Sequence, residues 1–183
     1  MNRRQFIQTS IAAPLAMAIP QIAGARTDDY WQRDRVLWLR RQGRDEEFRV
    51  VYWSNGQVDY DNYIRMCYIL RDATESQTVA MDVNLLNLLY GMQYWQELLT
   101  GRPSPWIVTS GFRTVEHNRR EGGVENSEHL HGRAGDLKSL QFTPGQVAQM
   151  ARFFGMGGVG VYDTFTHVDT GRLAFWNGKK RLR

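Results

Sequence analysis

The residues best suited to chemistry are four histidines, all in polar, glycine-punctuated segments of the second half of the chain. His129 and Asp136 share one short string, and His167 follows later. Two imidazole nitrogens and one carboxylate oxygen, with a fourth position open to water, are a usual donor set of hydrolytic zinc sites. The seven-residue offset from His129 to Asp136 does not fit one helix face, so the loop must fold back. Spacing alone favours a solvated or hydrogen-bonded surface loop.

Five short motifs give these histidines a context. They are residues 51–56 (VYWSNG), 110–114 (SGFRT), 127–136 (S-x-H-x-x-G-x-A-x-D), 157–162 (GGVGVY) and 167–171 (HVDTG). In this order they resemble the LAS zinc metallopeptidases, most closely the YcbK-like (MepK-like) murein endopeptidases, over residues 36–176. The resemblance implies an α+β fold of the hedgehog/DD-peptidase type, with an antiparallel central sheet flanked by helices. It also implies Zn2+-dependent hydrolysis of amide bonds in peptidoglycan stem peptides or their cross-links.

The resemblance assigns roles to particular residues. It implies that His129, Asp136 and His167 bind zinc, and that Arg113 lies near the substrate, where a guanidinium can hold a carboxylate or the developing oxyanion. A plain surface charge is the alternative for Arg113. His117 and His131 are not fixed as ligands by the family pattern, so we interpret them as additional loop histidines that could line the cleft.

The general base is less clear from the sequence. LAS enzymes often carry an acid three residues before the last histidine, but this position is Thr164 here, with Asp163 one residue farther away. On a continuous strand Asp169 would begin roughly 7 Å from His167 and Asp163 roughly 13 Å away. We therefore predict Asp169 first and Asp163 second as catalytic acids, with Glu128 a weaker third. Asp169 could instead accept a hydrogen bond from a histidine and orient it.

The elements expected before the histidine cluster are mainly apolar. Residues 36–40 and 48–53 predict a hairpin around the turn at residues 42–45. Apolar residues at helical spacing predict a helix near residues 63–70 and a second one that starts after Asp82 and ends at Gly101. We expect both helices to supply core, and we expect the lone Cys67 to be a buried structural thiol.

Short strands and loops must position the site itself. The pattern predicts strands at residues 106–109, 134–137, 158–162 and 165–169, and a polar loop over residues 113–128. Thr143, Pro144 and Gln146 predict a capped helix that runs to about Phe154. Mixed, non-alternating elements favour an α+β domain. Four aromatic residues at strand positions could contact substrate, although core is the commoner role: Trp53, Tyr162, Phe165 and Trp176.

The first twenty-five residues predict export. Arg3 and Arg4, followed by Phe6 and an apolar run over residues 11–23, resemble a signal read by the twin-arginine translocase, and residues 23–25 are small enough for signal peptidase. We therefore predict a signal peptide at residues 1–25, a single zinc peptidase domain at residues 26–183, and a periplasmic location. The alternatives are an amphipathic first helix or a membrane anchor. Removal of this segment lowers the net charge from +4 to +2, too little to indicate nucleic-acid binding but suited to an anionic wall polymer.

Two rival functions keep the same fold. A zinc-containing module that binds peptidoglycan without cleaving it is consistent with the missing acid at Thr164. An exported carboxypeptidase that acts on stem peptides would use the same metal site.

Overall fold

A mixed eight-stranded sheet organises the second of the two units into which the chain divides, Met1–Trp31 and Gln32–Arg183. The structure, a computed structural model, describes residues 31–178. The expected signal peptide and the start of the mature chain near Arg26 lie outside the described residues. No helix within residues 31–178 is long and apolar enough to cross a membrane.

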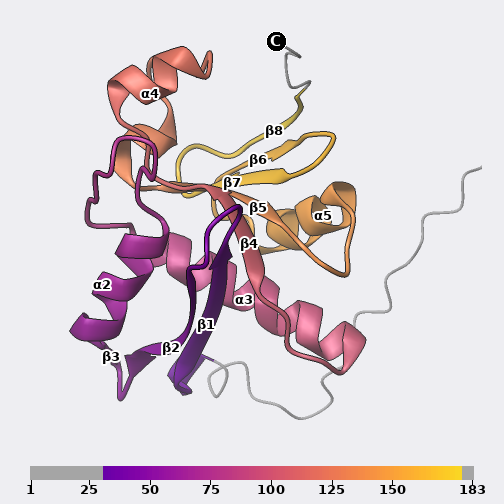
Figure 1. The fold of residues 1–183 in the computed structure, drawn as a ribbon. Helices are drawn as coiled ribbons and strands as arrows, with labels where there is room; N and C mark the ends of the chain where they lie inside the picture. Colours follow the sequence, from indigo (N-terminus) through magenta and orange to yellow (C-terminus); the bar gives the residue numbers. More distant parts are fainter. Residues whose placement is uncertain (1–30, 179–183) are drawn as a thin grey trace, which may run out of the picture. The chain divides into compact units, whose positions relative to one another are not determined.

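The strands follow the order β3-β2-β1-β4-β5-β7-β6-β8 (Figure 1). Their bounds are β1 Arg35–Arg41, β2 Glu47–Ser54, β3 Gln57–Val58, β4 Trp106–Ser110, β5 Ala134–Lys138, β6 Gly158–Val161, β7 Thr166–Asp169 and β8 Ala174–Asn177. Five of the seven strand pairings are antiparallel, and β1–β4 and β6–β8 are parallel. The predicted α+β class is confirmed. The parallel pairings are additions to the expected antiparallel sheet, and β1–β4 is possible because helices connect those two strands.

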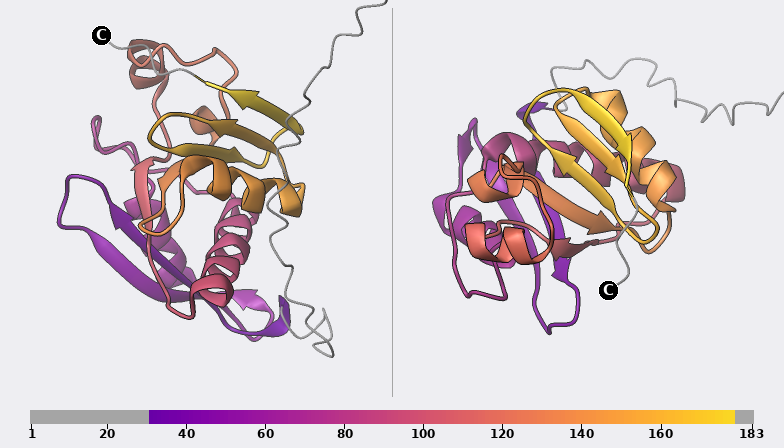
Figure 2. Two further views of the ribbon diagram at one scale, coloured as in Figure 1. Left: turned by 90° about the vertical axis from the view of Figure 1, so that its right-hand side faces the viewer. Right: turned by 90° about the horizontal axis from the view of Figure 1, so that it is seen from above.

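The helices pack on this sheet and on one another (Figure 2). They are α2 Tyr60–Ile69, α3 Val83–Thr100, α4 Val115–Arg120, the 3-10 helix η1 Glu128–His131, and α5 Pro144–Phe154. Helix α2 packs on β1 and β2, α3 packs on β1 and α5, and α5 packs on β6 and β7. The site described below therefore rests on strands that are supported by α5.

The first half of the sheet matches the sequence-based expectations. β1 and β2 form the predicted antiparallel hairpin. Helix α3 starts after Asp82, whose side chain accepts a hydrogen bond from the Asn84 backbone N–H, and ends at Gly101, which has φ of +68°. Leu85 and Leu89 on this helix are fully buried, as the apolar spacing predicts. Cys67 is also buried, in agreement with a structural role.

The second half contains elements that the sequence pattern did not predict. The expected polar loop over residues 113–128 folds into α4 and the start of η1, which are capped by the side chains of Thr114 and Ser127. These helices are too short to show apolar periodicity, so pattern analysis missed them. Strand β8 was also missed, because it is a short edge strand. The predicted capping box of α5, with Thr143 and Gln146, is present.

Strand register places one row of residues across five strands, β4, β5, β7, β6 and β8. The pairings run Ser110–Asp136, Asp136–His167, His167–Gly160 and Gly160–Trp176. Directly paired residues share one face of a sheet. This row brings residues that are distant in sequence to a single site.

Candidate metal centre

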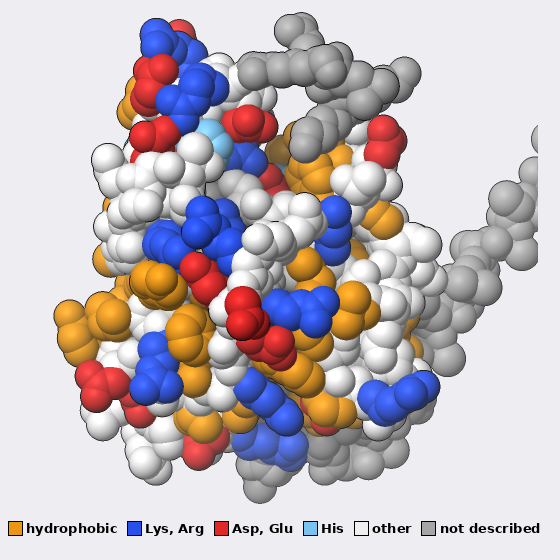
Figure 3. All heavy atoms as spheres, in the orientation of Figure 1, with side chains coloured by type: hydrophobic (Ala, Val, Ile, Leu, Met, Phe, Trp, Pro, Cys, Tyr) orange, Lys and Arg blue, Asp and Glu red, His pale blue; other side chains and the backbone are white. Residues whose placement is uncertain are grey.

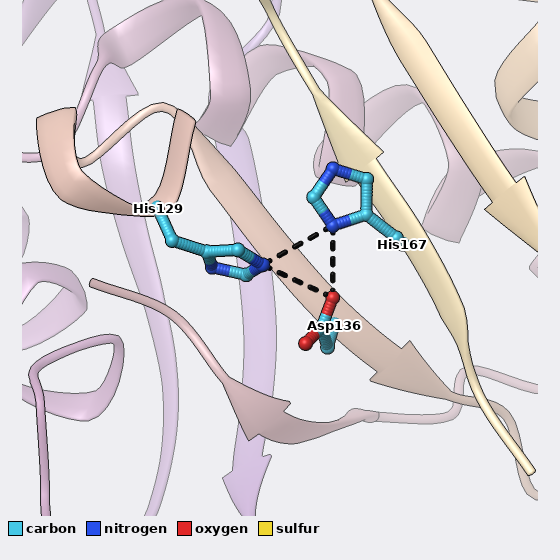
Figure 4. A group of neighbouring side chains, drawn as sticks. All are labelled: His129, Asp136 and His167. Atoms are coloured by element: carbon cyan, nitrogen blue, oxygen red, sulfur yellow. Dashed lines mark hydrogen bonds and ion pairs between the residues drawn. The ribbon is translucent and has the colours of Figure 1, made fainter. Parts of the chain in front are cut away.

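Three donor atoms converge at the centre of this row (Figure 4). His129 reaches in from η1, Asp136 from β5 and His167 from β7. His129 Nε2 lies 3.2 Å from Asp136 Oδ1 and 3.1 Å from His167 Nδ1, and His167 Nδ1 lies 2.9 Å from Asp136 Oδ1. All three residues are buried. The loop that carries His129 does fold back onto β5, as a metal site requires.

The position of His129 depends on the loop after β4. Its Nδ1 lies 2.5 Å from the carbonyl oxygen of Gly111. A carbonyl can only accept, so Nδ1 carries the proton and Nε2 presents a lone pair. Gly111 must be glycine, because a Cβ there would lie 2.1 Å from the carbonyl oxygen of Leu70. Gly132 ends η1 with φ of +64° and lets the chain turn into β5.

Arg113 fixes the carboxylate of Asp136. The guanidinium Nη2 donates to Asp136 Oδ2, and Nε donates to Ser110 Oγ at 2.7 Å. Asp136 Oδ1 therefore remains directed at the two histidines. The backbone N–H of Arg113 also donates to the carbonyl oxygen of His129. Thus the SGFRT motif supplies the groups that hold two of the three donors.

Asp169 holds the third donor from behind. Its Oδ2 lies 3.0 Å from His167 Nε2, and its Oδ1 accepts hydrogen bonds from the backbone N–H groups of Gly158 and Gly171, both at 2.8 Å. His167 Nε2 therefore carries a proton, and Nδ1 is the nitrogen that faces the centre, where it can offer a lone pair to a metal ion after losing its own proton. The GGVGVY and HVDTG motifs meet here.

The donor set fits a divalent metal ion. Two imidazole lone pairs and one carboxylate oxygen face the same point, an arrangement that repels itself unless a cation or proton lies between them. A tetrahedral ion with bonds of about 2.1 Å would hold its ligand atoms about 3.4 Å apart. The observed separations, from 2.9 to 3.2 Å, need to widen by only a few tenths of an ångström. Two nitrogens and one oxygen suit zinc and leave a fourth position.

The acid–base properties of the metal-free site follow from the same contacts. Burial lowers the pKa of His167, but hydrogen bonds with Asp136 and Asp169 outweigh it and raise this pKa to about 9. Burial lowers the pKa of His129 more than Asp136 raises it. Burial raises the pKa of Asp136, yet the attraction of His129 and the hydrogen bonds of both histidines hold it well below its ordinary value. Without metal, a proton on His167 therefore balances the buried carboxylate.

The other predicted acids lie apart from the three donors. Asp163 is exposed in the bend between β6 and β7, so the chain is not one continuous strand to Asp169. Glu128 pairs with Arg133 at 2.7 Å. Asp169 is the nearest of them, but it contacts the far nitrogen of His167.

The two remaining histidines are not in the cluster. His131 is exposed on η1. His117 Nδ1 lies 2.9 Å from Asp72 Oδ1, and Asp72 also accepts a hydrogen bond from the Thr114 backbone N–H. His117 therefore anchors α4. The sequence did not predict the contact between His117 and Asp72, because the two residues are far apart in the chain and no motif links them.

The sequence also did not predict that the Gly111 carbonyl binds His129, because every residue has a backbone carbonyl and its role does not depend on the residue type. Of the four aromatic candidates, Tyr162, Phe165 and Trp176 contact one another or His167. Trp53 lies on β2 at the other end of the sheet, stacked against Arg35.

Comparison with known families agrees with this geometry. The family model described as Peptidase M15 matches residues 63–169, more than half of the chain and including all three donors. This protein belongs to the M15 peptidase family. That assignment confirms the resemblance to zinc peptidases of this type inferred from the motifs.

Two curated relatives of the M15 chain are similar over part of its length. One is the probable peptidoglycan L,D-endopeptidase MepK of Haemophilus influenzae, 34% identical over 121 residues that cover 62% of this chain and 63% of that protein. Another is the zinc D-Ala-D-Ala carboxypeptidase of Streptomyces albus G, 31% identical over 99 residues that cover 51% of this chain and 38% of that protein. The chain thus spans less than two thirds of the length of either relative.

Proposed function

We propose that this protein is a zinc-dependent peptidoglycan hydrolase that cleaves amide bonds in stem-peptide cross-links during remodelling of the cell wall. The observation that carries the proposal is the convergence of three potential ligand atoms, from His129, Asp136 and His167, each of whose side chains is also bonded to a separate partner outside the cluster. Bringing these polar groups together in a buried site costs free energy unless a cation or proton lies between them. The contacts with Gly111, Arg113 and Asp169 nevertheless hold the three side chains in this arrangement. The names of the two relatives, a peptidoglycan endopeptidase and a zinc carboxypeptidase, support both the metal and the substrate class.

Zinc bound to these three residues supplies a Lewis acid that polarises a carbonyl and acidifies a water molecule. Arg113 acts beside it. Two of its guanidinium nitrogens hold Ser110 and Asp136, and we assign the remaining nitrogen, Nη1, to the substrate carboxylate or the developing oxyanion. Arg113 thus both positions a ligand and stabilises charge.

The two candidate acids take different roles. Asp169 accepts a hydrogen bond from His167 Nε2 through one oxygen and hydrogen bonds from two backbone N–H groups through the other. We therefore assign it the role of orienting His167, which the sequence left open. We assign the proton transfers of catalysis to Asp163, which is exposed in the bend between β6 and β7, because the third candidate, Glu128, is paired with Arg133. In this role Asp163 would accept a proton from the attacking water and pass it to the departing amine.

The proposed cellular context follows from the N-terminal sequence. Residues 1–25 form a twin-arginine signal peptide, the twin-arginine translocase exports the chain, and residues 26–183 act in the periplasm as a single zinc peptidase domain. Export after folding would let the metal be loaded before translocation. The substrate, peptidoglycan, lies outside the cytoplasmic membrane, in agreement with this route.

The decisive experiment measures metal content and products together. The mature protein is analysed for bound zinc and then incubated with muropeptides from purified sacculi, which are separated by chromatography and mass spectrometry. We expect about one zinc ion per chain and conversion of cross-linked dimers to monomers. Release of free D-alanine would instead identify a carboxypeptidase. Full zinc occupancy with no cleavage of any muropeptide would identify a binding module and refute the proposal.

A further inference from the structure

Trp176 lies in the same sheet row as the metal-site residues. Gly160 of β6 pairs with His167 on one side and with Trp176 of β8 on the other. Because Gly160 has no side chain, the indole reaches across it toward the imidazole. The two ring centroids are 5.3 Å apart, with the planes tilted by 45°.

Two glycines form the floor beneath this indole. A Cβ at Gly160 would lie 2.6 Å from the Cε2 and Nε1 atoms of Trp176, and a Cβ at Gly158 would lie 3.1 Å from its Cζ3 atom. Any larger residue at Gly160 would displace the ring. The alternating glycines of the GGVGVY motif therefore fix where Trp176 stands relative to His167.

Trp176 continues into a group of aromatic side chains, which we call the aromatic wall: Trp176, Tyr162 and Phe165. The indole Nε1 donates to the Tyr162 hydroxyl oxygen at 3.2 Å, and the Tyr162 ring stacks on Phe165 with centroids 4.4 Å apart and planes 10° apart. These contacts orient the indole and satisfy its polar atom. The wall is thus a fixed apolar surface beside His167.

Phe175, the neighbour of Trp176 on β8, lies on the opposite face and is itself exposed. Phe175 points to α5, where the Arg152 guanidinium lies 4.4 Å above its ring. Trp106, a core tryptophan, is fully buried and donates to the Leu89 carbonyl. Trp176 is only half-buried, on the face that carries the metal donors. Figure 3 shows charged side chains over α4 and hydrophobic side chains on the side of the strands β6 to β8.

The metal centre therefore has two unlike flanks. Arg113 provides a cationic flank and Trp176 provides an aromatic one. A peptide whose carbonyl lies at the metal can direct polar groups to Arg113 and a hydrocarbon group to the indole. Extending the proposed function, on which this inference rests, we propose that Trp176 is a specificity-determining residue that receives the alkyl side chain of the substrate residue adjoining the scissile amide.

The test compares peptides that differ by one methyl group. Two synthetic stem-peptide analogues, one with alanine and one with glycine next to the scissile amide, are titrated against the zinc-loaded mature protein by calorimetry, and KM and kcat are measured for both. We expect the wild type to prefer alanine about tenfold in Kd and in KM. Trp176→Ala should reduce this preference to about twofold or less, and Trp176→Phe should restore part of it.

Controls separate recognition from folding. Phe175→Ala changes the neighbouring residue on the opposite face, so it should leave the alanine preference intact. Zinc content should stay at the wild-type level in Trp176→Phe and in Phe175→Ala. A purely structural role for Trp176 would lower zinc content and kcat without changing the ratio between the two peptides.

The outcomes also separate this inference from the proposed function. An unchanged alanine preference in Trp176→Ala overturns the inference even if hydrolysis is normal. If the wild type binds the peptides but cleaves neither, the proposed function fails while the Kd ratios still test Trp176. A wild type that neither binds nor cleaves them overturns both.

Discussion

Where β1 packs on α3 the buried side chains are mainly hydrocarbon, whereas β5 and β7 also bury a cluster of charged and polar side chains. Leu37, Leu39 and Leu89 are fully buried in the first region. In the second, Asp136, His167 and Asp169 are buried together with His129. Apolar packing is non-directional, so many sequences satisfy it. Buried polar groups need partners at defined distances, so the second region tolerates little change and can do chemistry.

The largest effect is expected from removing one donor atom. His129→Ala leaves only two of the three ligands, so bound zinc should fall below about a tenth of an ion per chain and muropeptide cleavage by about a thousandfold or more. Elemental analysis and product chromatography measure the two effects. His131→Ala, an exposed histidine two residues away, is the matched control and should keep both. A full equivalent of zinc bound with wild-type affinity by His129→Ala would contradict the assignment.

Substitutions of Asp169 and Asp163 should have different effects, one on zinc affinity and the other on kcat. Asp169→Asn weakens the acceptor for the His167 Nε2 proton, so zinc affinity should fall about 10- to 100-fold. Asp163→Asn should leave zinc affinity unchanged and lower kcat by about 100-fold or more at saturating zinc. Competition with a chromophoric chelator and steady-state kinetics measure these quantities. The reverse pattern would exchange the two roles.

A change in the apolar region should affect stability and spare the metal. Leu89→Ala removes a fully buried side chain from α3, and we expect the free energy of unfolding to fall by about 2–5 kcal/mol. Zinc stoichiometry should be unchanged wherever the variant is folded. Leu98→Ala, on the same helix but 44% exposed, should change stability by less than about 0.5 kcal/mol. Urea denaturation measures both, and a loss of zinc by folded Leu89→Ala would erase the contrast between the regions.

The smallest effect concerns an ion pair outside both regions, between Glu46, just before β2, and Arg71, just after α2. A hydrogen bond from Arg71, at 2.7 Å, holds the pKa of Glu46 below its ordinary value of 4.5. A carboxyl with a lowered folded-state pKa stabilises the protein above its ordinary pKa, and this contribution is lost as the pH falls toward the folded-state value. Glu46→Gln should therefore cost less than about 1 kcal/mol at neutral pH. The difference in the free energy of unfolding between Glu46→Gln and wild type should shrink below pH 4.5. Urea denaturation at neutral pH and below pH 4.5 measures this difference, and the same value at both would show that the ion pair contributes nothing.

Much of the fold could be predicted from local sequence. The start of α3 at Asp82, its end at Gly101 and the capping box of α5 are set by contacts within a few residues, which the amino-acid order records directly. The missed elements, β3, α4, η1 and β8, are short and carry no long apolar stripe. Their stability comes from distant partners, as when Asp72 binds His117 and the Thr114 backbone.

The sequence by itself determined the family and named His129, Asp136 and His167 as candidate donors, because these residues stand in a recognisable order of motifs. Only the tertiary structure decided which atoms face inward, since the Gly111 carbonyl and the Asp169 carboxylate set the protonated nitrogen of each histidine. It also placed the Asp169 carboxylate against the Nε2 atom of His167 and brought Trp176 beside His167 across Gly160. The physical reason is that the sheet makes neighbours of strands that are far apart in the chain, and the order of strands in the sheet depends on the packing of the whole domain.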